Sequence, residues 1–192
     1  METREEIKER ILRLLRTTNR DGIEDLIKYL ETSDFFTAPA STKYHCNYEG
    51  GLAEHSLNVY RNLNELVKGK DFKSDTLIIC ALLHDICKTF FYITEMRNKK
   101  VNGNWVQEPY FTVKDEMPLG HGEKSCLIIS EYIKLTKEEI YAIRWHMGLG
   151  EPKENYGYMS DAFNKYPLAV YLHMADLMAT YITEAKGGDG NG

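Results

Sequence analysis

The sequence lacks the features that would place the protein in several specialised classes. No apolar run approaches the roughly 20 residues that a membrane-spanning helix needs. The amino terminus, Met-Glu-Thr-Arg-Glu-Glu, is charged and has no apolar core of a signal peptide. The four cysteines show no CxxC spacing. We therefore expect reduced thiols, a cytoplasmic location and no membrane partner.

The chain also has no excess of basic residues, no internal repeat and no linker-like segment. Its formal net charge is −5, which argues against long duplex nucleic acid as a partner, because duplex-binding proteins usually present a basic surface. Its 192 residues, 43% hydrophobic and 28% charged, suit one globular domain with a real core. We predict a single domain over residues 1–186 and a flexible, glycine-rich tail over 187–192.

Apolar periodicity predicts a mostly helical fold. Scaffold helices are expected within residues 1–31, followed by a long loop over 32–49. Further helices are expected over 52–68, 74–90, 118–134, 136–147 and 167–185, with a second loop over 151–166. Aromatic and branched residues flank a polar Asn-Gly segment at 98–104, which predicts a β-hairpin over about 90–113. The predicted fold class is all-α, with a hairpin insert that either covers one side of a site or is a structural flap.

The segment Ala81 to Lys88 carries the strongest chemical signal. An apolar run leads directly into His84 and Asp85, and Lys88 follows within one helical turn, on the same face of a helix. Burying these three groups costs free energy unless they are paired or bind a metal. A capped or salt-bridged helix end would explain the His-Asp pair alone, so the rest of the chain decides between the two interpretations.

Other histidines and aspartates fall on separate predicted helices, as ligands do in the core of a helix bundle. The candidate metal-binding set is His55, His84, Asp85, His121, His146 and Asp176. Imidazoles and carboxylates suit Mn, Fe, Ni, Co or Zn better than Ca. Six ligands exceed what one metal with an open position takes, so we predict two divalent transition metals. Two metals about 3.5–4 Å apart can clamp the attacking and leaving oxygens of phosphoryl transfer.

The order of these residues resembles the HD superfamily of metal-dependent phosphohydrolases. The matching stretches are Gly-Gly-Leu-Ala-Glu-His55-Ser, Leu-Leu-His84-Asp85-Ile-Cys-Lys88, Leu-Gly-His121, Arg-Trp-His146-Met-Gly and Leu-His-Met-Ala-Asp176. They cover most of the chain, from about residue 45 to 183. Within the superfamily, the likeness is to the HD domain of bacterial 3′-5′ exoribonucleases that join an OB-fold to an HD domain.

The resemblance implies a role for each residue of the set. The ligands of the first metal would be His55, His84, Asp85 and Asp176. Asp85 would bridge to a second metal, which His121 and His146 would complete. A hydroxide bridging the metals would attack the phosphate ester of a nucleotide or short oligonucleotide. Asp85 and Lys88 are the predicted catalytic residues, with Lys88 stabilising charge on a phosphoryl oxygen.

The two predicted loops supply candidate contacts to a small phosphorylated substrate, since loops carry function more often than their length suggests. The candidates are Lys43, Tyr44 and His45 from the first loop and Tyr156 from the second. For His45, a substrate contact and a solvated loop histidine are equally compatible with the sequence.

Two other functions would use the same residues. One is an HD-fold di-iron oxygenase, which would contain iron and consume O₂, whereas a phosphohydrolase would release phosphate with Mn, Ni, Co or Zn. The other is a non-catalytic nucleotide-binding regulator that keeps the fold without turnover. The complete ligand set argues against the regulator, because unused ligands have no physical reason to stay paired in a core.

Overall fold

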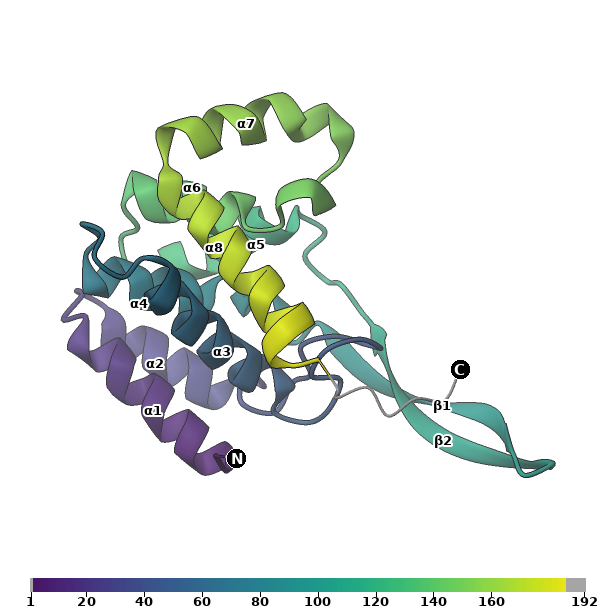
Figure 1. Ribbon diagram of the computed structural model, residues 1–192. Coiled ribbons are helices and arrows are strands. Elements are labelled where there is room, and N and C mark those ends of the chain that lie inside the picture. The colour runs from purple at the N-terminus through teal and green to yellow at the C-terminus, as the bar shows by residue number, and fades with distance from the viewer. Residues whose placement is uncertain (1, 186–192) are drawn as a thin grey trace.

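The computed structural model describes residues 2–185, which form a mainly helical structure with one β-hairpin (Figure 1). The α-helices are α1 (Arg4–Thr17), α2 (Ile23–Thr32), α3 (Gly51–Leu66), α4 (Ser74–Leu83), α5 (His121–Ser130), α6 (Lys137–Trp145), α7 (Tyr156–Lys165) and α8 (Pro167–Met178). Short 3-10 turns lie at η1 (Ile86–Lys88), η2 (Gly148–Gly150) and η3 (Lys153–Asn155), and a π-turn, η4 (Ala179–Thr183), follows α8. The strands β1 (Tyr92–Val101) and β2 (Asn104–Val113) pair antiparallel. The predicted fold class is confirmed, while the predicted tail at 187–192 lies outside the described residues.

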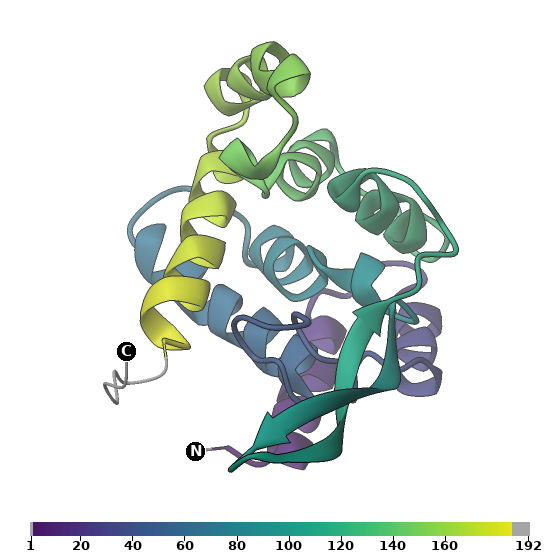
Figure 2. The same ribbon diagram turned by 90° about the vertical axis from the view of Figure 1, so that its right-hand side faces the viewer.

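Helix α4 lies in the middle of the bundle (Figure 2). It is buried from Thr76 to Leu83, and it contacts α1, α3 and α6. Such a helix is apolar on all sides because every side faces another element. Burial of each large aliphatic side chain contributes roughly 1.5–3 kcal/mol, so the apolar run before His84 anchors the site to the core. No helix within residues 2–185 is both long and apolar enough to cross a membrane.

The helix that carries the His-Asp pair is shorter than the sequence predicts. It ends at Leu83, and Asp85 has a non-helical backbone (φ −106°, ψ 16°). The Ser125 hydroxyl from α5 donates to the His84 carbonyl at 2.6 Å, and the Cys87 amide donates to the same hydroxyl at 3.3 Å. A side chain from another helix thus forms hydrogen bonds with backbone groups that have no partner within α4 once the helix ends. The residue pattern of α4 alone cannot predict this end, because it depends on a residue of α5.

The predicted loop over 151–166 is wrong, because α7 occupies most of it. Met159 and Ala162, three residues apart on one helix face, pack against Trp145 in a small cluster of their own. Figures 1 and 2 show α7 as the outermost helix of the bundle. The glycine and proline residues at 148–152 and the many polar residues hid this short amphipathic pattern.

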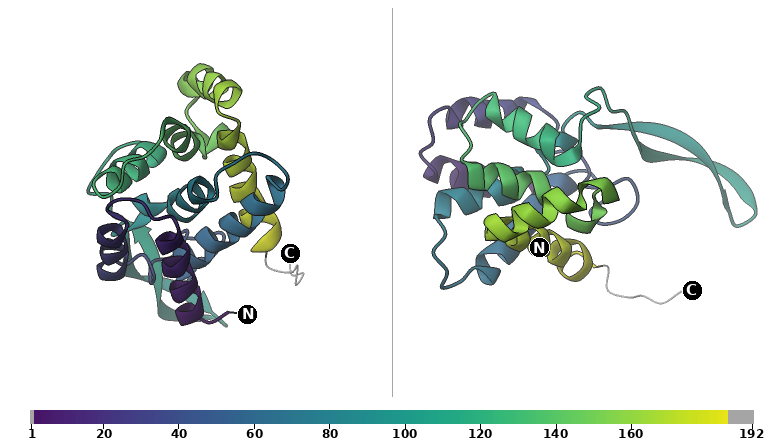
Figure 3. Two further views of the ribbon diagram at one scale, coloured as in Figure 1. Left: turned by 90° about the vertical axis from the view of Figure 1, so that its left-hand side faces the viewer. Right: turned by 90° about the horizontal axis from the view of Figure 1, so that it is seen from above.

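The predicted hairpin is confirmed, with a tighter turn than expected. Only Asn102 and Gly103 separate the strands, and both have positive φ, 50° and 86°, as a two-residue type I′ turn requires. The polar residues from 98 to 100 therefore belong to β1. The hairpin projects away from the bundle (Figure 3). Its base lies near the site, where the Tyr92 hydroxyl donates to the Ala40 carbonyl at 3.2 Å, but its far half does not cover the site.

Candidate metal centre

The six predicted metal-binding residues converge although they come from five separate places in the fold. His55 lies in the first half of α3 and Asp176 near the end of α8. The other four stand at helix ends: His84 and Asp85 after α4, His121 at the start of α5 and His146 directly after α6. A helix end lets the backbone turn, so these side chains reach one point that no single helix face could supply.

Asp85 is the centre of the cluster, and its two carboxylate oxygens face different histidines. Oδ2 lies 3.9 Å from Nε2 of His55 and 3.5 Å from Nε2 of His84. Oδ1 lies 2.5 Å from Nε2 of His121 and 3.5 Å from Nε2 of His146. One carboxylate thus divides the histidines into two pairs, which is the arrangement expected of a ligand that bridges two ions.

Asp176 supplies a second carboxylate to the same space. Its Oδ1 lies 3.1 Å from Nε2 of His55. Ligand atoms of Asp176, His84 and His146 also lie within 4.8 Å of one another. Asp176 is therefore close to His55 and His84, as the resemblance implies, and it also lies near His146 of the other pair.

Three of the imidazoles are held by one nitrogen and left open at the other. Nδ1 of His84 lies 2.8 Å from the Ala81 carbonyl, and Nδ1 of His146 lies 2.6 Å from the Ile143 carbonyl. Nδ1 of His55 lies 3.1 Å from the Glu184 carboxylate. Nδ1 donates in each case, which orients the ring and leaves the Nε2 lone pair available, as in metal-bound histidines.

The three Nε2 atoms are buried and make no hydrogen bond within the described residues. Burying such a polar group without a partner costs about 1–3 kcal/mol, so an arrangement that leaves three together calls for a ligand. A divalent transition metal fits this set of nitrogens and carboxylates. The chemistry of the donors therefore supports the predicted metal site.

The charges of the cluster also favour a bound cation. Burial lowers the pKa of His84 to about 4, so this ring stays neutral. Burial opposes ionisation of Asp85, yet Lys88 and the neighbouring histidines hold its pKa well below the usual range. Burial by itself lowers the pKa of His55, but the neighbouring carboxylates of Asp176 and Glu184 outweigh it and raise it to about 9. The site thus keeps its carboxylates ionised and attracts positive charge.

Lys88 lies where the sequence predicts, against Asp85. Its Nζ is 2.6 Å from Oδ2 of Asp85 and donates to the Ala40 carbonyl at 2.7 Å. These two contacts fix the ammonium group in the wall of a cavity of about 490 Å³, which His121 and Asp176 also line. The cavity gives a small ligand access to the cluster.

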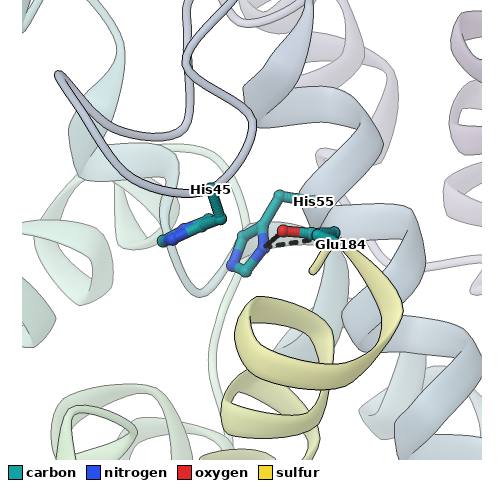
Figure 4. A group of neighbouring side chains, drawn as sticks. All are labelled: His45, His55 and Glu184. Atoms are coloured by element: carbon teal, nitrogen blue, oxygen red, sulfur yellow. Dashed lines mark hydrogen bonds and ion pairs between the residues drawn. The ribbon is translucent and has the colours of Figure 1, made fainter. Parts of the chain in front are cut away.

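The four predicted substrate contacts occupy different places. His45 lines the metal cavity, with its ring centroid 4.7 Å from that of His55 (Figure 4). Tyr44 lines an adjoining cavity, and Lys43 lines a third one beside the hairpin. Tyr156 donates from its hydroxyl to the Leu149 carbonyl at 3.1 Å and does not appear in the metal cavity wall. Substrate contact by these residues stays a prediction.

Glu184 is a residue of the site that the sequence analysis missed. Besides His55, it accepts a hydrogen bond from the Asn58 amide at 3.0 Å. It follows the π-turn η4, at the end of a segment in which no sequence pattern marks it. His173, next to the site, donates from Nδ1 to the His146 carbonyl at 2.7 Å and thus supports the backbone of a predicted ligand.

Comparisons with known proteins agree with this geometry. The family model of the HD domain matches residues 52–181. A dihydroneopterin 2′,3′-cyclic phosphate phosphodiesterase of Methanocaldococcus jannaschii is 35% identical over an alignment of 97 residues that covers 46% of this chain. The match spans only 37% of the length of that relative. No solved structure matches the chain. The matched region contains the entire candidate ligand set, and the chain belongs to the HD domain family.

Proposed function

We propose that this protein is a metal-dependent phosphohydrolase that acts on a phosphate ester of a nucleotide or short oligonucleotide. The observation that carries the proposal is the divided carboxylate of Asp85, with one histidine pair at each oxygen. Membership of the HD domain family supports it. A cytoplasmic location and the likeness to exoribonucleases stay predictions.

The residues that would hold two divalent ions are His55, His84, Asp85, His121, His146 and Asp176. Bound there, Mn, Fe, Ni, Co or Zn would supply Lewis acidity to phosphoryl oxygens and a water of lowered pKa.

The chain's own contribution is to position charge. Lys88 is held between Asp85 and the Ala40 carbonyl, so its ammonium needs no reorganisation to face a phosphoryl oxygen in the cavity. The buried histidines exclude bulk water from one side of the reacting group, and His121, which is partly exposed, stands at the open side.

The relative in Methanocaldococcus jannaschii is named for the hydrolysis of a 2′,3′-cyclic phosphate. This supports a diester, and in particular a cyclic one, as the first substrate to test, with a monoester as the alternative.

The test is a substrate and metal screen of the purified protein. The screen compares the rates of ester hydrolysis of 2′,3′-cyclic nucleotides and of nucleoside monophosphates under the same conditions. We expect hydrolysis of the 2′,3′-cyclic nucleotides with at least one of Mn, Fe, Ni, Co or Zn. Lys88→Met should lower kcat roughly 10²–10³-fold, the usual effect of removing one transition-state donor. The matched control is Lys68→Met, at an exposed lysine just after the end of α3. This substitution should leave kcat unchanged.

Other outcomes would contradict the proposal. Iron in the protein, with O₂ uptake and no phosphate ester cleavage, would favour the oxygenase. Nucleotide binding without turnover in any metal would favour the regulator.

A further inference from the structure

A second cavity adjoins the metal centre and shares part of its wall. It has a volume of about 610 Å³, within the range of small-molecule sites. His45, Thr180 and Tyr181 line both cavities. The two cavities therefore adjoin, so one ligand with its phosphate at the metal centre can place the rest of its structure against this shared wall.

His55 and Glu184 connect the two cavities physically. Nε2 of His55 faces Asp176 on the metal side, whereas its Nδ1 contacts Glu184, which lines the second cavity. Figure 4 shows His45 on the opposite side of the His55 ring from the main body of α3. Both ring nitrogens of His45 are buried and make no hydrogen bond within the described residues, so the ring at this junction has unused hydrogen-bonding capacity.

The second cavity is unsuited to another phosphate. Its described lining includes the carboxylates of Glu54 and Glu184 and contains no lysine or arginine. Contacts with Nδ1 of His55 and with the Asn58 amide hold the Glu184 carboxylate in the cavity wall. A second phosphate there would meet like charge without a compensating cation.

The same lining suits an aromatic ring that carries N–H donors. Tyr44 and Tyr181 are exposed at 74% and 73% although both border the cavity, so their rings are available for stacking. Oε2 of Glu54 accepts the Tyr48 hydroxyl at 2.9 Å, while its Oε1 has no hydrogen bond among residues 2–185. A carboxylate of this kind pairs well with two adjacent N–H donors.

Building on the proposed function, we propose that the second cavity binds the heterocycle of a single nucleotide whose base presents adjacent N–H donors, as guanine does. The base packs against Tyr181 and Tyr44 and donates to Glu54, while the phosphate lies at the metal centre. The substrate thus carries one phosphate group, open or cyclic, and no second phosphate on the side of the base. An oligonucleotide that continues through this cavity is excluded.

The first experiment measures binding without catalysis. Guanosine, which has no phosphate, is tested by equilibrium dialysis against chelator-treated wild type, Tyr181→Ala and Tyr158→Ala. Stacking of a base on an aromatic side chain is worth about 1–3 kcal/mol, so Tyr181→Ala should weaken binding roughly 5- to 150-fold. Tyr158 is as exposed as Tyr181, at 72%, but does not line the cavity, so Tyr158→Ala should bind like wild type.

The second experiment uses the metal-loaded protein to test whether a second phosphate group on the substrate is disfavoured. We expect kcat/KM for a guanosine monophosphate ester to exceed that for the guanosine bisphosphate by about tenfold or more. In Glu54→Gln, the ratio of these two kcat/KM values should be smaller than in wild type. Equal use of both substrates by wild type would overturn the inference. Guanosine binding that is absent, or unchanged in Tyr181→Ala, would overturn it as well. Guanosine binding that depends on Tyr181, with no ester cleaved in any metal, would support the pocket and contradict the phosphohydrolase proposal.

Discussion

Two clusters of buried charge lie in this bundle, and they differ in how their hydrogen bonds are completed. At the first, Glu139 is fully buried, and Arg20 pairs with it and with Asp75. The Thr76 hydroxyl and the Thr136 amide donate to the two oxygens of Glu139 at 2.9 and 2.7 Å. This cluster, which we call the Glu139 cluster, is complete within the chain.

The metal centre is as deeply buried but incomplete. Its Nε2 atoms of His55, His84 and His146 have no hydrogen-bond partner among the described residues. The Glu139 cluster joins the turn after α1 to α4 and α6 and needs nothing further, whereas the open Nε2 atoms of the metal centre need a ligand from outside the chain. Buried polar groups therefore indicate function when their bonding is unfinished, and structure when it is finished.

The largest expected effect is on the metal centre itself. Asp85→Asn removes the charge that both histidine pairs face, so we expect loss of bound metal and a fall of activity to background. Elemental analysis and the ester assay measure this, with circular dichroism to verify folding. The control is Asp161→Asn, at an exposed position of α7. Retention of the wild-type metal content and of activity in Asp85→Asn would refute the site.

The next largest effect is on the Glu139 cluster, and it is an effect on stability alone. Glu139→Ala leaves the Arg20 guanidinium without its buried partner, so we expect the free energy of unfolding to fall by about 3–5 kcal/mol. Urea denaturation measures it, while the metal content per folded chain should not change. Glu131→Ala, at an exposed site that forms no ion pair within residues 2–185, should stay within about 0.5 kcal/mol of wild type. A metal loss in Glu139→Ala would show that the two clusters are not independent.

The smallest expected effect comes from a residue that orients a predicted metal ligand and is not itself one. Glu184→Gln keeps the shape of the side chain but weakens its hold on Nδ1 of His55, so metal affinity should fall about 10–100-fold, as for other residues that orient metal ligands. Competition with a chelator of known affinity measures the change, with Glu154→Gln in an exposed turn as control. Unchanged affinity would mean that Glu184 serves only the second cavity.

Local patterns in the sequence predicted most of the helices and the hairpin. The predicted helix over 136–147 corresponds to α6, which opens with a capping box of Thr136 and Glu139, two residues only three positions apart. The hairpin followed from its aromatic strands and from Asn102-Gly103. These features depend on residues a few positions apart, so the sequence displays them directly. α7 was missed because its helical pattern is short and its partner, Trp145, lies ten or more residues earlier in the chain.

The candidate ligands could be listed from the sequence, because histidine and aspartate next to apolar runs stand out as chemically costly. Their arrangement could not be predicted in this way. That Asp85 turns out of α4 depends on Ser125 of α5, and that Glu184 orients His55 depends on a contact across 129 positions.

By itself, then, the sequence determined the helical class, the hairpin and the identities of the groups that can bind metal. Only the tertiary structure decided which oxygen of Asp85 faces which histidines, that the Nε2 atoms remain open, and that an acidic, tyrosine-lined cavity adjoins the centre. The physical reason is the distance along the chain over which the deciding interactions act. Helix and hairpin formation are governed by neighbours along the chain, whereas the bonding state of a buried group is set by whichever distant side chains the packed core brings to it.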